Sequence, residues 1–275
     1  MELVTIRLDG GTRAGRVEED SVVVLEAPSV KEILTDPAGL EAGARAEDGR
    51  TIPLADAELA PVVPRPDKII CIGANYRDHI EEMGRTPPSH PTYFAKFARS
   101  LIGARDDLVL PPAELSTDID WEGELAVIIG KPARNVSGAE AFDAIAGFCV
   151  LDDVSVRDWQ RRTTQFLAGK TWEGLTPLGP ALVTADQVGD GSGLALTTTV
   201  NGVVKQESNT SNLVFNAIDA VSDLSRILTL DPGDVIATGT PGGVGVARKP
   251  PEFLSPGDEV VVTIEGLGSL TNRCR

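Results

Sequence analysis

The sequence predicts an α+β fold that is mainly β, built on a β-roll or β-sandwich. Short segments rich in β-branched residues recur along the 275 residues, with turn residues between them. Only about three segments carry apolar residues at helical spacing. Hydrophobic residues make up 41% of the chain, which is enough for one large domain, or for a domain with a small appendage.

The appendage is expected at the N-terminal end, as a small β-rich domain over residues 1–62. MELVTIRL and SVVVLEA are predicted strands, with DGGTRAG as the turn between them. VKEILTDPAG is predicted to form one short helix that ends at Pro37 and Gly39. The stretch PVVPRPDK is stiff and poor in hydrogen-bond donors, so we expect a catalytic domain to follow it over residues 65–275.

The elements of this larger domain follow from composition and periodicity. The hairpin LTTTVNGVVKQES has Asn201-Gly202 at its tip, which is the dipeptide that tight hairpins favour. NLVFNAIDAVSDLSRILTL carries apolar residues at helical spacing. The remaining predictions are strands in KIICIGANY, LAVIIGK and DVIATGTPGGVG, a short helix in RDHIEEMGR, a helix running into a strand in GAEAFDAIAGFCVLDDV, and a closing β pair in SPGDEVVVTIEGLGSLTNRC.

The charge and the cysteines restrict the classes of partner. A net charge of −16 argues against nucleic acid or an anionic membrane surface as the main partner, whereas local cations can still attract a small anionic substrate. The N-terminus has no basic segment followed by an apolar one, and no run approaches the roughly 18 apolar residues of a membrane helix. We therefore expect a cytoplasmic protein. Three widely spaced cysteines, Cys71, Cys149 and Cys274, are expected to be buried reduced thiols.

Four acids occupy alternate positions just before an apolar run: Asp118, Asp120, Glu122 and Glu124. Alternate residues of a strand share one face, and burying unpaired like charges is costly. Both faces are apolar beyond the acids, so we expect a strand covered on both sides. The acids mark either a solvated strand end or a site for a hard divalent cation such as Mg²⁺, Mn²⁺ or Ca²⁺. In the second case, the compensating positive charge comes from outside the chain.

A third carboxylate is expected in FCVLDDVSVRDWQ, where an apolar strand runs directly into Asp152 and Asp153. Arg157 and Gln160 follow three residues apart, so on a helix they share a face. An arginine can hold a carboxylate through two hydrogen bonds, which suits a small oxo acid. The alternative is an N-capped helix with an internal ion pair.

Further reactive residues lie on either side of the acids. His79 and Glu82 are three residues apart on a predicted helix, where a carboxylate can orient an imidazole as a general base; an ordinary surface pair is the alternative. Lys170 lies in a loop rich in Gly and Pro, as a solvated charge or as a cation facing an oxyanion. Thr238, Thr240 and the glycines of ATGTPGGVG can approach a carboxylate, but the order of a phosphate loop is missing.

The chain resembles the fumarylacetoacetate hydrolase family over roughly residues 66–270, and in particular its bacterial members with a small N-terminal domain. The resemblance rests on seven segments in order: IGANYRDHIEEMG, PTYFAKFARSLIG, DWEGELAVIIGK, GFCVLDDVSVRDWQ, GKTWEGLTPLGP, VNGVVKQESNTSNLVF and TGTPGGVG. Their order and spacing are far more specific than any one segment. At Glu173, many members carry an aspartate.

The resemblance implies a role for each matching residue. Glu122, Glu124 and Asp153 match positions that chelate Mg²⁺ or Mn²⁺, with Asp152 as the weaker ligand candidate, Asp120 outside the ligand set and Asp118 in solvent. His79 and Glu82 match the pair that activates water, and Lys170 matches a lysine that faces developing charge. The positions that match the substrate site are Arg157, Gln160, Thr240 and Tyr76.

The resemblance also implies a reaction class. Metal-dependent hydrolysis of a C–C bond in an acylpyruvate or other diketo acid is the favoured activity. Decarboxylation of oxaloacetate, or isomerisation or hydration of a 2-oxo-diene-dioate in aromatic catabolism, are the alternatives, because one site supports all three. A metal- and ligand-binding protein without catalysis is the minor alternative. The family also implies a homodimer.

Overall fold

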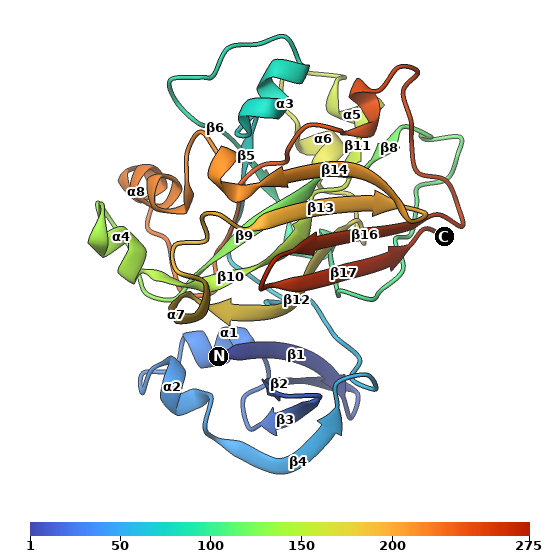
Figure 1. The fold of residues 1–275 in the computed structure, drawn as a ribbon. Coiled ribbons are helices and arrows are strands. Elements are labelled where there is room, and N and C mark those ends of the chain that lie inside the picture. Colours follow the sequence, from blue (N-terminus) through green and yellow to red (C-terminus); the bar gives the residue numbers. More distant parts are fainter.

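A computed structural model describes residues 1–275 and confirms the α+β, mainly β, fold (Figure 1). The strands are β1 (Glu2–Leu8), β2 (Gly11–Glu18), β3 (Ser21–Leu25), β4 (Glu47–Pro53), β5 (Ile69–Gly73), β6 (Thr92–Lys96), β7 (Leu101–Ile102), β8 (Ile119–Asp120), β9 (Gly123–Ile129), β10 (Ile145–Asp152), β11 (Ser155–Val156), β12 (Thr176–Thr184), β13 (Ala195–Val200), β14 (Val203–Asn209), β15 (Val235–Ala237), β16 (Glu259–Ile264) and β17 (Gly268–Arg273).

The helices are short and lie around the sheets. They are α1 (Val30–Leu34), α2 (Leu40–Gly43), α3 (Arg77–Glu82), α4 (Ala139–Asp143), α5 (Arg157–Gln160), α6 (Leu167–Lys170), α7 (Ala185–Val188) and α8 (Ala217–Ile227), with 3-10 turns η1 (Ala98–Ser100), η2 (Thr210–Asn212) and η3 (Gly245–Ala247). None of these helices is long and apolar enough to cross a membrane. All three cysteines are buried free thiols, as predicted.

Two sheets form the main body. The large sheet has the order β4-β3-β2-β1-β12-β10-β9-β15-β5-β6, with β7 paired to β12, and the smaller sheet has the order β14-β13-β16-β17. The smaller sheet lies across β9, β10 and β12. Gly123 allows this close approach, because a Cβ atom there would lie 2.4 Å from the Thr198 hydroxyl. The hydrophobic core between the sheets includes Leu125, Val127 and Val262.

β9 is buried over its whole length, as predicted. Leu125, Val127 and Ile129 belong to the core between the sheets, whereas Ala126 and Ile128 belong to a second core on the other side. The acids at the start of β9 are therefore held against the interior. The Asn201-Gly202 hairpin is also confirmed, with φ angles of 52° and 75° that only such residues adopt readily.

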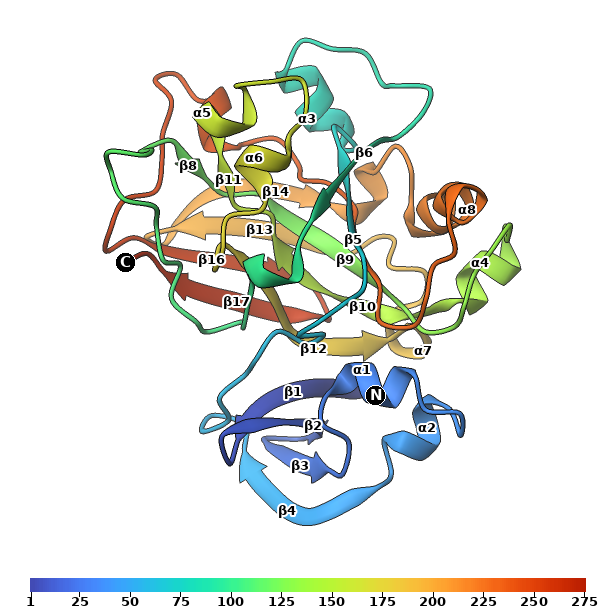
Figure 2. The same cartoon turned by 180° about the vertical axis from the view of Figure 1, so that it is seen from behind.

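The N-terminal residues continue the large sheet of the main body, below β12 in Figure 2. β1 pairs antiparallel with β12, with Glu2 opposite Val183 and Leu3 opposite Leu182. The turn predicted over DGGTRAG is confirmed at Asp9 and Gly10 but is shorter than expected, because β2 begins at Gly11 and Ala14 is buried within it. β4 was not predicted; its side chains are mostly exposed, so its sequence shows no apolar alternation.

The shared core predicts that the two parts unfold together. Leu3 is 0% exposed and belongs to the same core as Leu182, so Leu3→Ala should remove about 2–5 kcal/mol of stability. Calorimetry should show one unfolding transition that moves to lower temperature as a whole. Glu41→Ala, at a pair that is 77–78% exposed, is the control and should change little. Two transitions, of which only one moves, would contradict this coupling.

Candidate active site and metal centre

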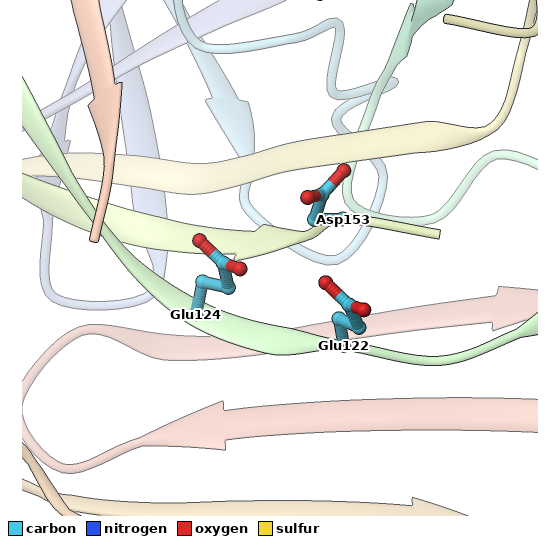
Figure 3. Close-up of side chains that lie close together, drawn as sticks. All are labelled: Glu122, Glu124 and Asp153. Carbon is cyan, nitrogen blue, oxygen red and sulfur yellow. The ribbon is translucent and has the colours of Figure 1, made fainter. Parts of the chain in front are cut away.

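The three predicted ligand carboxylates come together at one end of the paired strands β9 and β10 (Figure 3). Glu122 precedes β9, Glu124 lies within it, and Asp153 directly follows β10. The register places Leu151 opposite Glu124 and Asp152 opposite Gly123, which brings Asp153 beside the two glutamates. Their candidate ligand oxygens all lie within 4.8 Å of one another, and all three residues are buried.

Three cationic side chains of the chain itself reach these carboxylates. The Lys170 ammonium lies 2.6 Å from Glu122 Oε2 and 2.7 Å from Asp153 Oδ2. Lys96 lies 2.6 Å from Asp153 Oδ1, and Arg157 lies 2.6 Å from Glu122 Oε1. The expectation that the positive charge would come only from outside the chain is therefore wrong. These cations come from β6, α5 and α6, so the local pattern around β9 could not reveal them.

The three cations compensate the negative charge of Glu122 and Asp153 but form no ion pair with Glu124. Burial raises the pKa of Glu122, but Lys170 and Arg157 outweigh it and lower this pKa to about 2. Glu124 has no ion pair; its carboxylate accepts only the Gly239 N–H, at 2.8 Å. Burial, Asp153 and Glu122 together raise the pKa of Glu124 well above its usual range. Glu124 is thus the one carboxylate of the triad whose charge the protein leaves uncompensated.

This donor set fits a hard divalent cation. The triad offers only carboxylate oxygens, the ligands that Mg²⁺ and Mn²⁺ prefer, and no Cys or His belongs to it. A bound divalent ion would also offset the charge of Glu124, which otherwise stays buried at a cost. Asp152 lies outside the triad: its carboxylate accepts the Glu122 N–H at 2.9 Å, and burial raises its pKa to about 7.

Asp120 joins Arg157 to the loop after β15. Its carboxylate is fully buried and accepts from Arg157 Nε at 2.8 Å, Gly245 N at 2.7 Å and Val246 N at 3.0 Å. Arg157 also donates to Gln160 Oε1 at 3.0 Å. The Arg157 guanidinium is therefore engaged by Asp120, Glu122 and Gln160, rather than free to hold a substrate carboxylate through two hydrogen bonds.

The two other residues predicted to bind substrate, Thr240 and Tyr76, differ in their hydrogen bonds. The Thr240 hydroxyl donates to Gly123 O at 3.0 Å and accepts from Gln206 at 2.7 Å, so it fastens the start of β9. Tyr76 is fully buried, and its hydroxyl has no hydrogen-bond partner. Burial and the nearby Glu124 raise the pKa of this phenol.

His79 and Glu82 face each other on α3, with Nδ1 3.3 Å from Oε2. The Glu82 carboxylate also accepts the Gly243 N–H, at 3.1 and 3.2 Å, while Asp78 accepts from Ser208 at 2.7 Å. Burial raises the pKa of Glu82, but the bonds from His79 and Gly243 lower it more. These contacts fix α3 against the glycine-rich turn and leave Nε2 of His79 without a protein partner.

A cavity of about 620 Å³ brings most of these groups together. Its walls include both residues of the α3 pair, two of the triad carboxylates, and Lys170, Arg157, Gln160 and Thr240. Tyr76 and Asp153 are fully buried and do not line this cavity. Lys96, Asp78 and Gln206 were missed by the sequence analysis, because each acts through a contact between segments far apart in the chain.

Comparisons with known proteins agree along the whole chain. The family model described as fumarylacetoacetate (FAA) hydrolase C-terminal matches residues 68–275, and that described as Rv2993c-like, N-terminal matches residues 1–61. The human mitochondrial oxaloacetate tautomerase FAHD2A is 50% identical over 217 residues, covering 78% of this chain and 68% of its own.

Two solved structures share the fold over the full length of this chain. Fumarylacetoacetate hydrolase from Exiguobacterium antarcticum is 33% identical with a TM-score of 0.88, covering 100% of this chain and 99% of its own. Maleylpyruvate hydrolase from Sphingobium sp. SYK-6, solved with manganese and pyruvate, is 30% identical with a TM-score of 0.81, covering 100% and 98%. The protein is therefore an enzyme of the fumarylacetoacetate hydrolase family.

Proposed function

We propose that the protein catalyses keto–enol tautomerisation of a small 2-oxo acid, with oxaloacetate as the first substrate to test. One observation carries the proposal: His79 and Glu82, which together can act as a general base, line the same cavity as Lys170 and two carboxylates of the triad. The choice of tautomerisation over the hydrolysis favoured by the sequence follows the relatives, since the 50% identical human protein is named an oxaloacetate tautomerase. The Mg²⁺ or Mn²⁺ implied by the sequence is part of the same proposal.

The chemistry requires only that a proton moves. His79 takes a proton from the carbon beside the 2-oxo group at Nε2, because Glu82 occupies Nδ1. The electron pair of the broken C–H bond moves towards the 2-oxo oxygen, and the buried ammonium of Lys170 stabilises negative charge there. Glu122, Glu124 and Asp153 would hold a divalent cation, which would supply Lewis acidity to the reaction. His79 then returns the proton to oxygen, so no co-reactant is consumed.

Hydrolysis of an acylpyruvate is the second candidate. The fixed His79–Glu82 pair can deprotonate water as readily as carbon, and the 30% identical maleylpyruvate hydrolase carries manganese and pyruvate. The two activities differ in their products. Tautomerisation removes the ultraviolet absorbance of enol-oxaloacetate without forming pyruvate, decarboxylation forms pyruvate from oxaloacetate, and hydrolysis forms pyruvate from acylpyruvates. Rates of all three, measured on one preparation with Mn²⁺, decide between them; no acceleration of enol loss would refute the main proposal.

His79→Ala should slow tautomerisation about 10²–10⁴-fold while changing Mn²⁺ affinity little, because the imidazole moves the proton and its side-chain hydrogen bond goes to Glu82, which is outside the triad. The measurement is the rate of enol loss, together with calorimetric Mn²⁺ titration. His90→Ala is the matched control, since His90 is the other histidine and lies exposed in a loop. A His79→Ala enzyme with full activity would show that another group moves the proton.

Three expectations from the sequence join this proposal. We propose a homodimer, which light scattering tests, and a cytoplasmic location, which fractionation of the source cell tests. We also propose residues 1–62 and 65–275 as structural units, although the continuous sheet joins them. The remaining alternative is binding without catalysis; tight stoichiometric binding of a 2-oxo acid without any turnover would support it.

A further inference from the structure

The lysine and arginine side chains that line the cavity fall into two groups. Arg157 and Lys170 are 5% and 2% exposed, and each is paired with carboxylates of the protein. Arg85 and Arg161 are exposed, and neither side chain has an ion pair or a hydrogen bond. The chain carries 41 acids and 25 Lys and Arg residues, so two guanidinium groups without a protein partner form a local positive region in this cavity.

Arg161 is held near the carboxylate triad through its neighbour Arg157. Arg161 directly follows α5, and its backbone N–H donates to Arg157 O at 3.1 Å, while Arg157 contacts Glu122. The next residue, Arg162, stacks on the Trp159 ring at 3.4 Å and does not line the cavity. Arg85 reaches the same cavity from the segment after α3. The two free guanidinium groups therefore follow the helices that carry the other site residues: α3 with His79 and Glu82, and α5 with Gln160.

The cations near the triad differ from the two arginines in how far they are already paired. Lys170 and Arg157 are held by carboxylates of the protein, so a second carboxylate of the substrate finds few free donors there. Arg85 and Arg161 offer planar donors that fit a carboxylate through paired hydrogen bonds. Apolar side chains, among them Phe94 and Phe166 at a centroid distance of 5.7 Å, supply a wall for the carbon chain of a substrate.

We propose that Arg161, with Arg85, binds a second carboxylate of the substrate and so selects 2-oxo dicarboxylates over 2-oxo monocarboxylates. This inference rests on the proposed function, which it deepens by naming the substrate class and the residues that select it. A cavity of about 620 Å³ accommodates such a molecule together with water. Free guanidinium groups at the exposed wall also attract dianions towards a protein whose overall charge repels them.

The experiment compares two ligands that differ only in the distal carboxylate, 2-oxoglutarate and 2-oxopentanoate, bound to the Mn²⁺-loaded full chain. The wild type should bind 2-oxoglutarate at least about tenfold more tightly. Arg161→Gln and Arg85→Gln should each remove most of this preference and leave 2-oxopentanoate binding within about twofold. The matched controls are Arg162→Gln and Arg77→Gln, which remove the same charge from exposed neighbours outside the cavity.

Turnover separates this inference from the proposed function. With oxaloacetate, Arg161→Gln should raise KM with little change in kcat, because the guanidinium binds the substrate away from the reacting carbon. If the wild type shows no tautomerisation but the ligand preference depends on Arg161, the second-carboxylate site stands and the proposed function fails. Equal binding of the two ligands by the wild type, or an equal loss in Arg162→Gln, would overturn the site even where tautomerisation is observed.

Discussion

Glu124→Gln is expected to abolish divalent-cation binding and at the same time to stabilise the metal-free protein. The first effect follows because the amide has no charge to offer a hard cation. The second follows because Glu124 is buried beside Asp153 and Glu122 without an ion pair, which holds its pKa well above the ordinary range. At neutral pH the unfolded chain carries this group ionised, whereas the folded, metal-free protein disfavours that form.

The sign of this effect depends on pH. A raised pKa of a carboxyl group destabilises the folded state above the ordinary pKa of about 4.3, and the penalty disappears below it. In chelator, the variant should melt at a higher temperature than the wild type near pH 7.5, and the difference should vanish near pH 4. Calorimetric Mn²⁺ titration and thermal unfolding measure the two effects. Glu173→Gln is the matched control, since Glu173 is 69% exposed and pairs only with Arg99.

A variant that binds Mn²⁺ as tightly as the wild type would remove Glu124 from the ligand set. A variant that is less stable in chelator would show that the carboxylate is already compensated in the metal-free protein. The two results are independent, so either part of the interpretation can fail alone.

Lys170→Met is expected to reduce both activity and stability strongly. Its ammonium bridges Glu122 and Asp153 while only 2% exposed, and removing one partner of a buried ion pair costs about 3–5 kcal/mol. The melting temperature in chelator should fall by about 10 °C. Tautomerisation should slow about 10²–10³-fold, because the positive charge that stabilises the developing oxyanion is lost.

Excess Mn²⁺ should restore much of the stability of this variant and little of its rate, since a cation can replace the missing charge between the carboxylates without replacing the ammonium group. Thermal unfolding with and without Mn²⁺ and the enol assay measure the two. The control is Lys31→Met, whose partner Asp67 is 64% exposed and whose loss should cost about 1 kcal/mol or less. Full activity in Lys170→Met would contradict the assigned role.

The parts of the site that the sequence predicted correctly depend on local patterns. Alternation places Glu122 and Glu124 on one face of a strand, and the apolar run of β10 points to a third carboxylate at Asp152 or Asp153. The choice of Asp153 came from the resemblance to the family, and the pairing of β9 with β10 brings it beside the two glutamates. The helix that carries His79 and Glu82 was predicted in the same way. Each of these features is contained within a few consecutive residues.

The parts that were missed depend on contacts between distant segments. Lys96 and Asp153 are 57 residues apart, and β1 meets β12 about 180 residues along the chain. No periodicity reports such pairings. The hydrogen-bond partners of Arg157 and Thr240 were missed for the same reason, because Asp120 and Gln206 come from elsewhere in the fold. Arg161 escaped notice because it lies in an exposed polar stretch without any pattern.

The most direct test of this account is a titration of metal-free protein with Mn²⁺ in which bound metal and the rate of enol-oxaloacetate loss are measured in the same sample. If Glu122, Glu124 and Asp153 hold the ion that the reaction needs, the rate should rise in proportion to bound Mn²⁺ and level off at one ion per chain. Glu124→Gln should show neither binding nor the rise. Full activity in the chelated protein, or one bound Mn²⁺ without any change in rate, would contradict the account.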